Sequence, residues 1–134
     1  MGKLLYEALS YEIRGACFSV WKQFRGAFKE TIIQRALVKE FKDRNLNIEE
    51  QKRIDIFYKN ENVGTYVPDF VIDDKILVEL KSKPSLFGED KKQFWRYLKG
   101  SSYKVGLLIN FGSQKLEIIR RVYDAARDHP RFPA

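Results

Sequence analysis

Apolar residues in the first third of the chain recur every three or four positions, which is the spacing of one face of an α-helix. The first stripe consists of Leu5, Leu9, Ile13, Cys17, Val20 and Phe24. A break at Arg25-Gly26 follows it, and a second stripe consists of Phe28, Ile33, Leu37 and Phe41. This pattern predicts two consecutive helices, the second over about residues 27–44.

The period changes in the middle of the chain. Apolar and polar residues alternate over residues 53–58, as they do in a half-buried β-strand. Residues 66–72 and 76–81 have the composition of two further strands, with turn signals at 59–62 and 73–74. We therefore expect two antiparallel hairpins in series.

The last third predicts a helix over residues 89–98, a nearly continuous apolar strand over 105–111 and a final strand over 116–122. The predicted class is thus α/β, a mixed sheet flanked by helices in the order α-α-β-β-β-α-β-β. A strand, a helix and a further strand after Lys81 indicate a right-handed crossover. We expect residues 1–123 to form one domain and residues 124–134 a flexible tail.

The charge of the chain favours an acidic partner. Its 134 residues carry a net charge of +7 with a pI of about 9.5, which suits nucleic acid first and an anionic membrane surface second. A soluble basic domain without such a partner remains the plainer alternative. The lone Cys17 excludes an internal disulfide, and with His129 as the only histidine a Cys/His zinc site is excluded too. Without a transmembrane-length run or a signal-peptide pattern, we expect a cytoplasmic protein.

Three residues in the middle of the chain carry candidate chemistry. Glu79 and Lys81 are two apart on a predicted strand, so they point to the same face about 7 Å apart. Asp69 lies on the neighbouring strand, and the turn at 73–74 can bring it near Glu79. Two converging carboxylates suit a hard divalent cation, and a lysine beside them can stabilise charge on a phosphate. A surface salt-bridge pattern is the alternative interpretation of the same spacing.

Glu30 is a fourth candidate. It falls within the apolar stripe of the second predicted helix, where a carboxylate is unfavourable unless another group stabilises it. One interpretation is that it stabilises the first turn of that helix, whose dipole favours an anion. The other is that Glu30 reaches the same cation as Asp69 and Glu79.

The surrounding motifs resemble a known family. Pro68-Asp69 followed by Glu79-Leu80-Lys81 resembles the Pro-Asp…(Asp/Glu)-x-Lys signature of the PD-(D/E)XK, or restriction-endonuclease-like, nuclease superfamily. Gln93 and Tyr97 resemble its Gln-x-x-x-Tyr element. The segments 107–112 and 115–117 are similar to the closing part of the bacterial GxxExxY protein family. Glu30 matches the glutamate of that name, whereas Ala27 and Ile33 replace its glycine and tyrosine.

The resemblance implies a divalent-metal-dependent nuclease, with Mg²⁺ or Mn²⁺ as its cofactor. Asp69, Glu79, the Leu80 carbonyl and Glu30 would then be metal ligands, Lys81 the catalytic lysine and Gln93 a further site residue. The expected substrate is DNA rather than RNA, cut with little sequence specificity. A homodimer is compatible with so small a chain. The alternative is an inactive nucleic-acid-binding or interaction module that keeps the fold.

Basic residues surround the third predicted helix. Lys91, Lys92, Arg96 and Lys99 lie on its remaining faces, Trp95 is expected to be exposed among them, and Lys83 and Lys104 lie nearby in sequence. Such residues usually form a solvated face. Beside a phosphodiester site they would also hold a nucleic-acid backbone, with Trp95 suited to stacking on a base. For Tyr97, one turn from Gln93, we expect an ordinary buried position.

Overall fold

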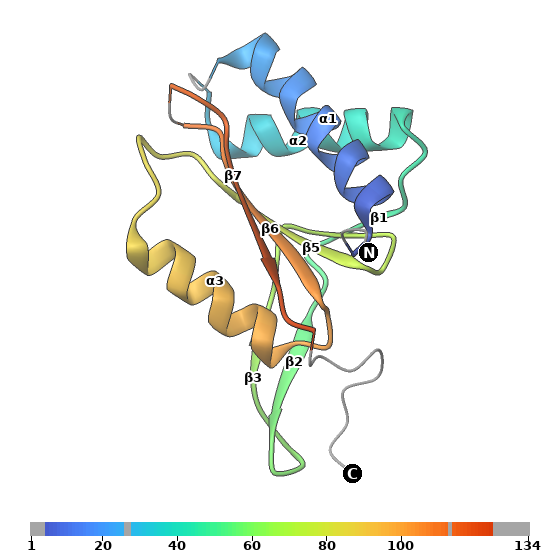
Figure 1. Cartoon of the computed structure of the whole chain (residues 1–134), viewed down its shortest axis with the longest axis vertical. Helices are drawn as coiled ribbons and strands as arrows, with labels where there is room; N and C mark the ends of the chain where they lie inside the picture. The colour runs from blue at the N-terminus through green and yellow to red at the C-terminus, as the bar shows by residue number, and fades with distance from the viewer. Residues whose placement is uncertain (1–4, 26–27, 113, 125–134) are drawn as a thin grey trace.

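A computed structural model describes residues 5–25, 28–112 and 114–124 (Figure 1). The expected tail, apart from Asp124, and the positions of Ala27 and His129 lie outside these ranges. The chain forms α1 (Glu7–Phe24), α2 (Glu30–Asp43), β1 (Ile48–Glu50), β2 (Ile54–Tyr58), β3 (Glu61–Tyr66), β4 (Phe70–Ile72), β5 (Ile76–Lys81), α3 (Gly88–Gly100), β6 (Val105–Asn110) and β7 (Glu117–Val122). The predicted mixed α/β class is confirmed, with two helices, a run of strands, a helix and two closing strands.

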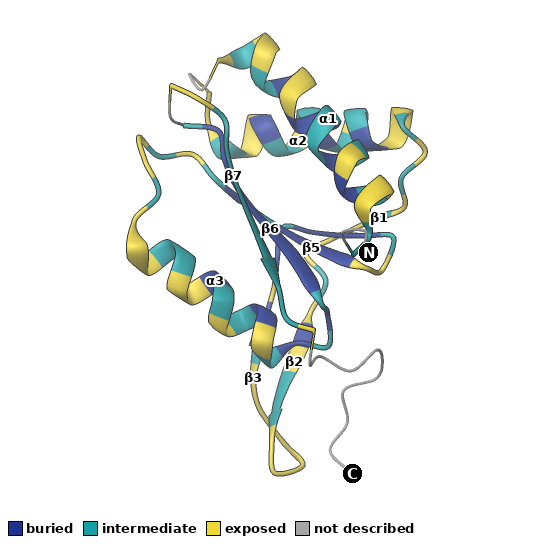
Figure 2. Cartoon of the chain, viewed as in Figure 1, coloured by how far each residue is buried: buried dark blue, intermediate teal, exposed yellow. Residues whose placement is uncertain are grey.

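The central sheet has five strands in the order β1-β4-β5-β6-β7. Among the strands that the structure describes, only β5 and β6 pair in parallel, and α3 is the crossover between them. The other neighbours pair antiparallel. Strands β5 and β6 are buried along most of their length (Figure 2), as expected for central strands covered on both faces.

The two faces of this sheet are covered by different elements (Figure 1). Helices α1 and α2 pack on one face, where Phe41 meets Phe70 edge-to-face with ring centroids 5.3 Å apart. Helix α3 covers the other face, against a smaller core that includes Val71, Leu77 and Leu98. Cys17, a member of the first apolar stripe, is fully buried in the core of this face, and its burial raises the pKa of the thiol to about 12.

The expected strand over residues 66–72 is wrong as a single element. The chain leaves β3 at Tyr66 and enters β4 only at Phe70, because Pro68 has no N–H to donate to a ladder. The break separates two sheets: β2 and β3 form a hairpin of their own, which projects away from α1 and α2 (Figure 1), and β4 joins the central sheet. The short strand β1 was not predicted, since its three residues show no alternation of apolar and polar side chains.

No described helix combines the length and the apolar character that crossing a membrane requires.

Candidate active site

Asp69 and Glu79 lie opposite each other at one end of the central sheet. Phe70 and Val78 form the outermost pair of the β4–β5 ladder, so the next residue on each strand places Asp69 beside Glu79. Side chains alternate along a strand, so both carboxylates share the face of Val71 and Leu77, the face that α3 covers. Lys81, two residues beyond Glu79, lies on that face too.

Two hydrogen bonds hold Asp69 in place. Its Oδ2 accepts the backbone N–H of Leu80 at 2.7 Å, and Gln51, just after β1, also bonds its side chain. Burial raises the pKa of Asp69, although the Leu80 N–H and the charge of Lys81 oppose this. Asp69 is therefore a partly desolvated carboxyl group with a fixed orientation.

Glu79 is the most perturbed of the described carboxyl groups. Burial and the neighbouring charge of Asp69 raise its pKa to about 7, while the Tyr66 hydroxyl and Lys81 act in the opposite direction. The Tyr66 hydroxyl donates to Glu79 Oε1 at 3.0 Å. The negative charge of Asp69 thus disfavours the ionisation of Glu79, as expected where two carboxyl groups lie close together.

Glu30 lies close enough to this pair to interact with it electrostatically. It is the first residue of α2 and is half-buried. Burial and the charge of Asp69 raise its pKa, and Lys81 lowers it. Glu30 lies in the first turn of α2, after the N-cap residue Lys29, whose side chain makes no capping hydrogen bond. The tertiary structure thus brings Glu30, Asp69, Glu79 and Lys81 into one electrostatic neighbourhood.

The Leu80 carbonyl faces the same edge as Asp69. The carbonyl of Lys81 accepts the Phe111 N–H on the β6 side, at 2.9 Å. Successive carbonyls along a strand point in opposite directions, so the carbonyl of Leu80 points towards β4. Carboxylate and carbonyl oxygens are ligands that Mg²⁺ accepts, and these residues fit such an ion chemically. Nevertheless, within 5–25, 28–112 and 114–124 no three His, Cys, Asp or Glu side chains form a group that could hold a metal ion.

A cavity of about 210 Å³ opens beside these residues. Glu79, Lys81, Gln93, Tyr66 and Tyr97 are among its lining residues. The expectation of an ordinary buried position for Tyr97 is wrong: its half-buried ring stacks on that of Tyr66, with centroids 4.3 Å apart and planes 7° apart. Helix α3 therefore presents Gln93 and Tyr97, one turn apart, to the cavity.

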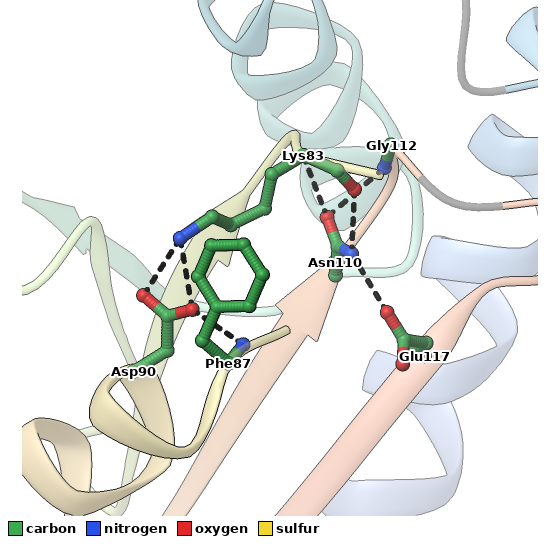
Figure 3. Close-up of polar contacts among 6 residues, drawn as sticks. All are labelled: Lys83, Phe87, Asp90, Asn110, Gly112 and Glu117. Atoms are coloured by element: carbon green, nitrogen blue, oxygen red, sulfur yellow. Dashed lines mark hydrogen bonds and ion pairs between the residues drawn. The ribbon is translucent and has the colours of Figure 1, made fainter. Parts of the chain in front are cut away.

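A buried amide fixes the chain just after Lys81 (Figure 3). Asn110, which pairs with Lys81 in the β5–β6 ladder, accepts the Lys83 N–H at 3.0 Å and donates to the Lys83 carbonyl at 2.9 Å. It also accepts the N–H of Gly112 and donates to Glu117. No sequence pattern predicts this network, because Asn110 is a single polar residue at the end of an apolar strand.

The ammonium group of Lys83 is engaged inside the protein. It contacts both carboxylate oxygens of Asp90, at 3.0 and 2.9 Å, and lies 4.5 Å from the centroid of the Phe87 ring (Figure 3). Hydrogen bonds from Lys83 and from the Phe87 N–H lower the pKa of Asp90. Lys83 therefore anchors the start of α3, in place of the free positive charge suggested by the sequence.

Comparison with known proteins agrees with this geometry. The family model of the PD-(D/E)XK nuclease superfamily matches residues 7–122, which include every described helix and strand. The comparisons with curated proteins and with solved structures gave no match. Since the family model covers most of the chain, the protein belongs to the PD-(D/E)XK nuclease superfamily.

Proposed function

We propose that the protein is a divalent-metal-dependent nuclease that hydrolyses phosphodiester bonds, with DNA as its substrate. The observation that carries this proposal is the opposed pair Asp69 and Glu79 beside Lys81 and an open cavity, where burial and the charge of Asp69 raise the pKa of Glu79 to about 7. An ordinary surface ion pair would not hold two partly buried acids side by side. Family membership makes a nucleic-acid substrate the first choice.

In this proposal the Asp69 and Glu79 carboxylates and the Leu80 carbonyl hold Mg²⁺ or Mn²⁺, with Glu30 as a further ligand. The bound metal would supply charge stabilisation and a more acidic water. Binding requires Glu79 to be ionised, and its Oε1 is already engaged by Tyr66, so Glu79 would use its second oxygen or exchange partners. Three side chains and one carbonyl leave positions for water on an octahedral ion, and Mg²⁺ retains water in most protein sites.

The remaining residues would act on the phosphate. The Lys81 ammonium, on the same face as Glu79, would stabilise the negative charge that develops on the phosphate oxygens during attack by water. Gln93 is exposed at the rim of the cavity and would donate a hydrogen bond to a phosphate oxygen. None of these residues reads a base edge, so we expect little sequence specificity.

We also propose a place for the chain close to the GxxExxY proteins. The supporting residues are Glu30, which lies near Asp69, and the closing segment, in which Asn110, Gly112 and Glu117 form one hydrogen-bonded network. Ile33, which stands at the position of the tyrosine in the GxxExxY motif, is a buried core residue of α2. An aliphatic side chain therefore packs where that motif has an aromatic one.

The test combines cleavage with direct metal titration. Wild-type protein should cut plasmid DNA with Mg²⁺ or Mn²⁺, stop with EDTA, and turn over poorly with Ca²⁺ because its looser geometry positions water less well. Asp69→Asn and Glu79→Gln should lose calorimetric metal binding and cleavage together. Glu61→Gln, an exposed change on β3, is the matched control. Wild-type metal binding without cleavage of DNA or RNA, single- or double-stranded, would instead favour an inactive nucleic-acid-binding module.

A further inference from the structure

Helix α3 carries positive charge on the side away from the cavity. Gln93 and Tyr97 face the cavity, whereas Lys91, Lys92 and Trp95 line a groove of about 370 Å³ between α3 and the edge strand β7. Arg120, Arg121 and Val122 line the other side of this groove. None of the six lining residues is acidic. The Arg120 guanidinium turns away to donate to the Leu5 carbonyl, so the cationic side chains of this shallow depression are those of Lys91, Lys92 and Arg121.

The sheet register explains how β7 contributes to the groove. Arg121 pairs with Gly106 of β6, so both residues lie on the face that α3 covers. An added Cβ at Gly106 would lie 2.6 Å from the Phe94 ring, which shows how closely α3 packs there. A neighbouring long side chain on that face therefore extends alongside the helix. The Arg121 guanidinium donates to the Arg120 carbonyl at 3.1 Å, which orients it.

Within the described parts of the chain, Lys91, Lys92 and Arg121 form no ion pair with a carboxylate. By contrast, Lys83 and Lys52, which lie elsewhere, are paired. The half-buried Trp95 forms an apolar wall, held edge-to-face against Tyr123 at 5.9 Å. It is less exposed than the sequence suggested.

We propose that the groove between α3 and β7 binds the phosphodiester backbone of nucleic acid, as a second contact separate from the carboxylate site. Unpaired lysine and arginine side chains along a depression are the usual recognition chemistry for successive phosphates. The choice of nucleic acid as ligand rests on the proposed nuclease function. The groove and the cavity flank the same helix. A nucleic-acid strand that crosses the exposed side of α3, at Lys92 and Arg96, therefore reaches both.

The test removes three positive charges from the groove and, in a control variant, three from a distant surface, and compares the binding of DNA. The groove variant is Lys91→Gln/Lys92→Gln/Arg121→Gln. The control is Lys22→Gln/Arg35→Gln/Lys42→Gln, which makes the same change in net charge at exposed positions of α1 and α2, on the opposite face of the sheet. Binding of labelled 20-base-pair DNA is followed by fluorescence anisotropy in EDTA, so that no cleavage occurs. Circular dichroism checks that both variants fold.

The groove variant should bind at least tenfold more weakly at low salt. The slope of log affinity against log salt should decrease in magnitude by about two to three, because each lost phosphate contact removes about 0.9 from that slope. The control should stay within about twofold of wild type, and two duplexes of unrelated sequence should behave alike. Equal weakening in both variants, or no weakening in the groove variant, would overturn the proposal. The proposal would also be overturned if the groove variant lost binding to anionic lipid vesicles more strongly than binding to DNA.

The two proposals fail in different ways. If wild-type protein cuts DNA while the groove variant binds normally, the groove proposal is wrong and the nuclease proposal stands. If no cleavage is found but the groove variant loses DNA binding, the nuclease proposal fails and the groove remains a nucleic-acid-binding site. If both hold, the groove variant should show a raised KM with kcat close to that of wild type.

Discussion

The Tyr66 hydroxyl donates a 3.0 Å hydrogen bond to Oε1 of Glu79 and so links the base of the β2–β3 hairpin to a carboxyl group whose pKa is raised to about 7. The ring of Tyr66 is held in turn by its stack on Tyr97 of α3. Three elements that are distant in sequence therefore meet at one carboxyl group. This arrangement gives the hairpin and α3 a direct influence on the protonation of Glu79.

Tyr66→Phe should raise the pKa of Glu79 further, because the lost hydrogen bond stabilises the ionised form. A hydrogen bond to a charged group contributes about 1.5–3 kcal/mol, so the acidic limb of the pH–activity profile should shift upward by about one pH unit. Tyr97→Phe is the control, because it removes a hydroxyl from the same stacked pair but leaves the bond to Glu79 intact. An unchanged pH midpoint in Tyr66→Phe would show that this bond does not control Glu79.

Without metal, Glu79 should make the folded protein less stable as the pH rises. Its pKa is about 7 in the folded state and 4.5 ordinarily, so its contribution to stability is fully present below pH 4.5 and lost as the pH rises to about 7. Glu79→Gln should therefore raise the free energy of unfolding at pH 8 by on the order of 1 kcal/mol and change it little near pH 4.5.

Urea denaturation at the two pH values measures this difference. Adding Mg²⁺ at pH 8 should stabilise the wild type but not the variant, because only the wild type keeps the carboxylate. If Glu79→Gln is destabilising at pH 8 without metal, burial does not disfavour the ionised form of Glu79.

Lys81→Gln should separate metal binding from the chemical step. Its loss removes a positive charge beside Asp69 and Glu79, so metal affinity should stay the same or increase. The rate of cleavage should fall by about 10²–10³, the usual effect of losing one oriented electrostatic group. Lys75→Gln, an exposed change in the turn before β5, should alter neither quantity. Cleavage at the wild-type rate by Lys81→Gln would remove this lysine from the mechanism.

Gly112→Ala should disturb the fold near the site, because an added Cβ would lie 2.2 Å from the backbone nitrogen of Lys83. The backbone must shift, and the Asn110 bonds to Lys83 and Gly112 would be strained. We expect a loss of about 1–3 kcal/mol in thermal or urea unfolding. Gly88→Ala, at the first position of α3 with nothing within 4 Å of the added Cβ, should be neutral or slightly stabilising. Equal stability of the two variants would contradict this close approach.

Much of the local structure was predictable from the sequence. The helical spacing of Ile13 and Cys17 in α1, and of Ile33 and Leu37 in α2, marked the faces that are buried. The two-residue period of a strand placed Glu79 and Lys81 on one face before any fold was known. These predictions succeeded because each depends only on the repeat of a single helix or strand.

Other features depend on which segments pair across space, so they follow from the tertiary fold. No local pattern indicates that β1 pairs with β4, that Tyr66 reaches Glu79, or that Arg121 lies beside α3. The same holds for Asn110, whose amide contacts Lys83, 27 residues earlier in the chain. Such contacts arise from the combined packing of many residues. The candidate acids and the lysine could therefore be identified from local patterns in the chain, whereas their neighbours, their burial and hence their protonation follow from the fold.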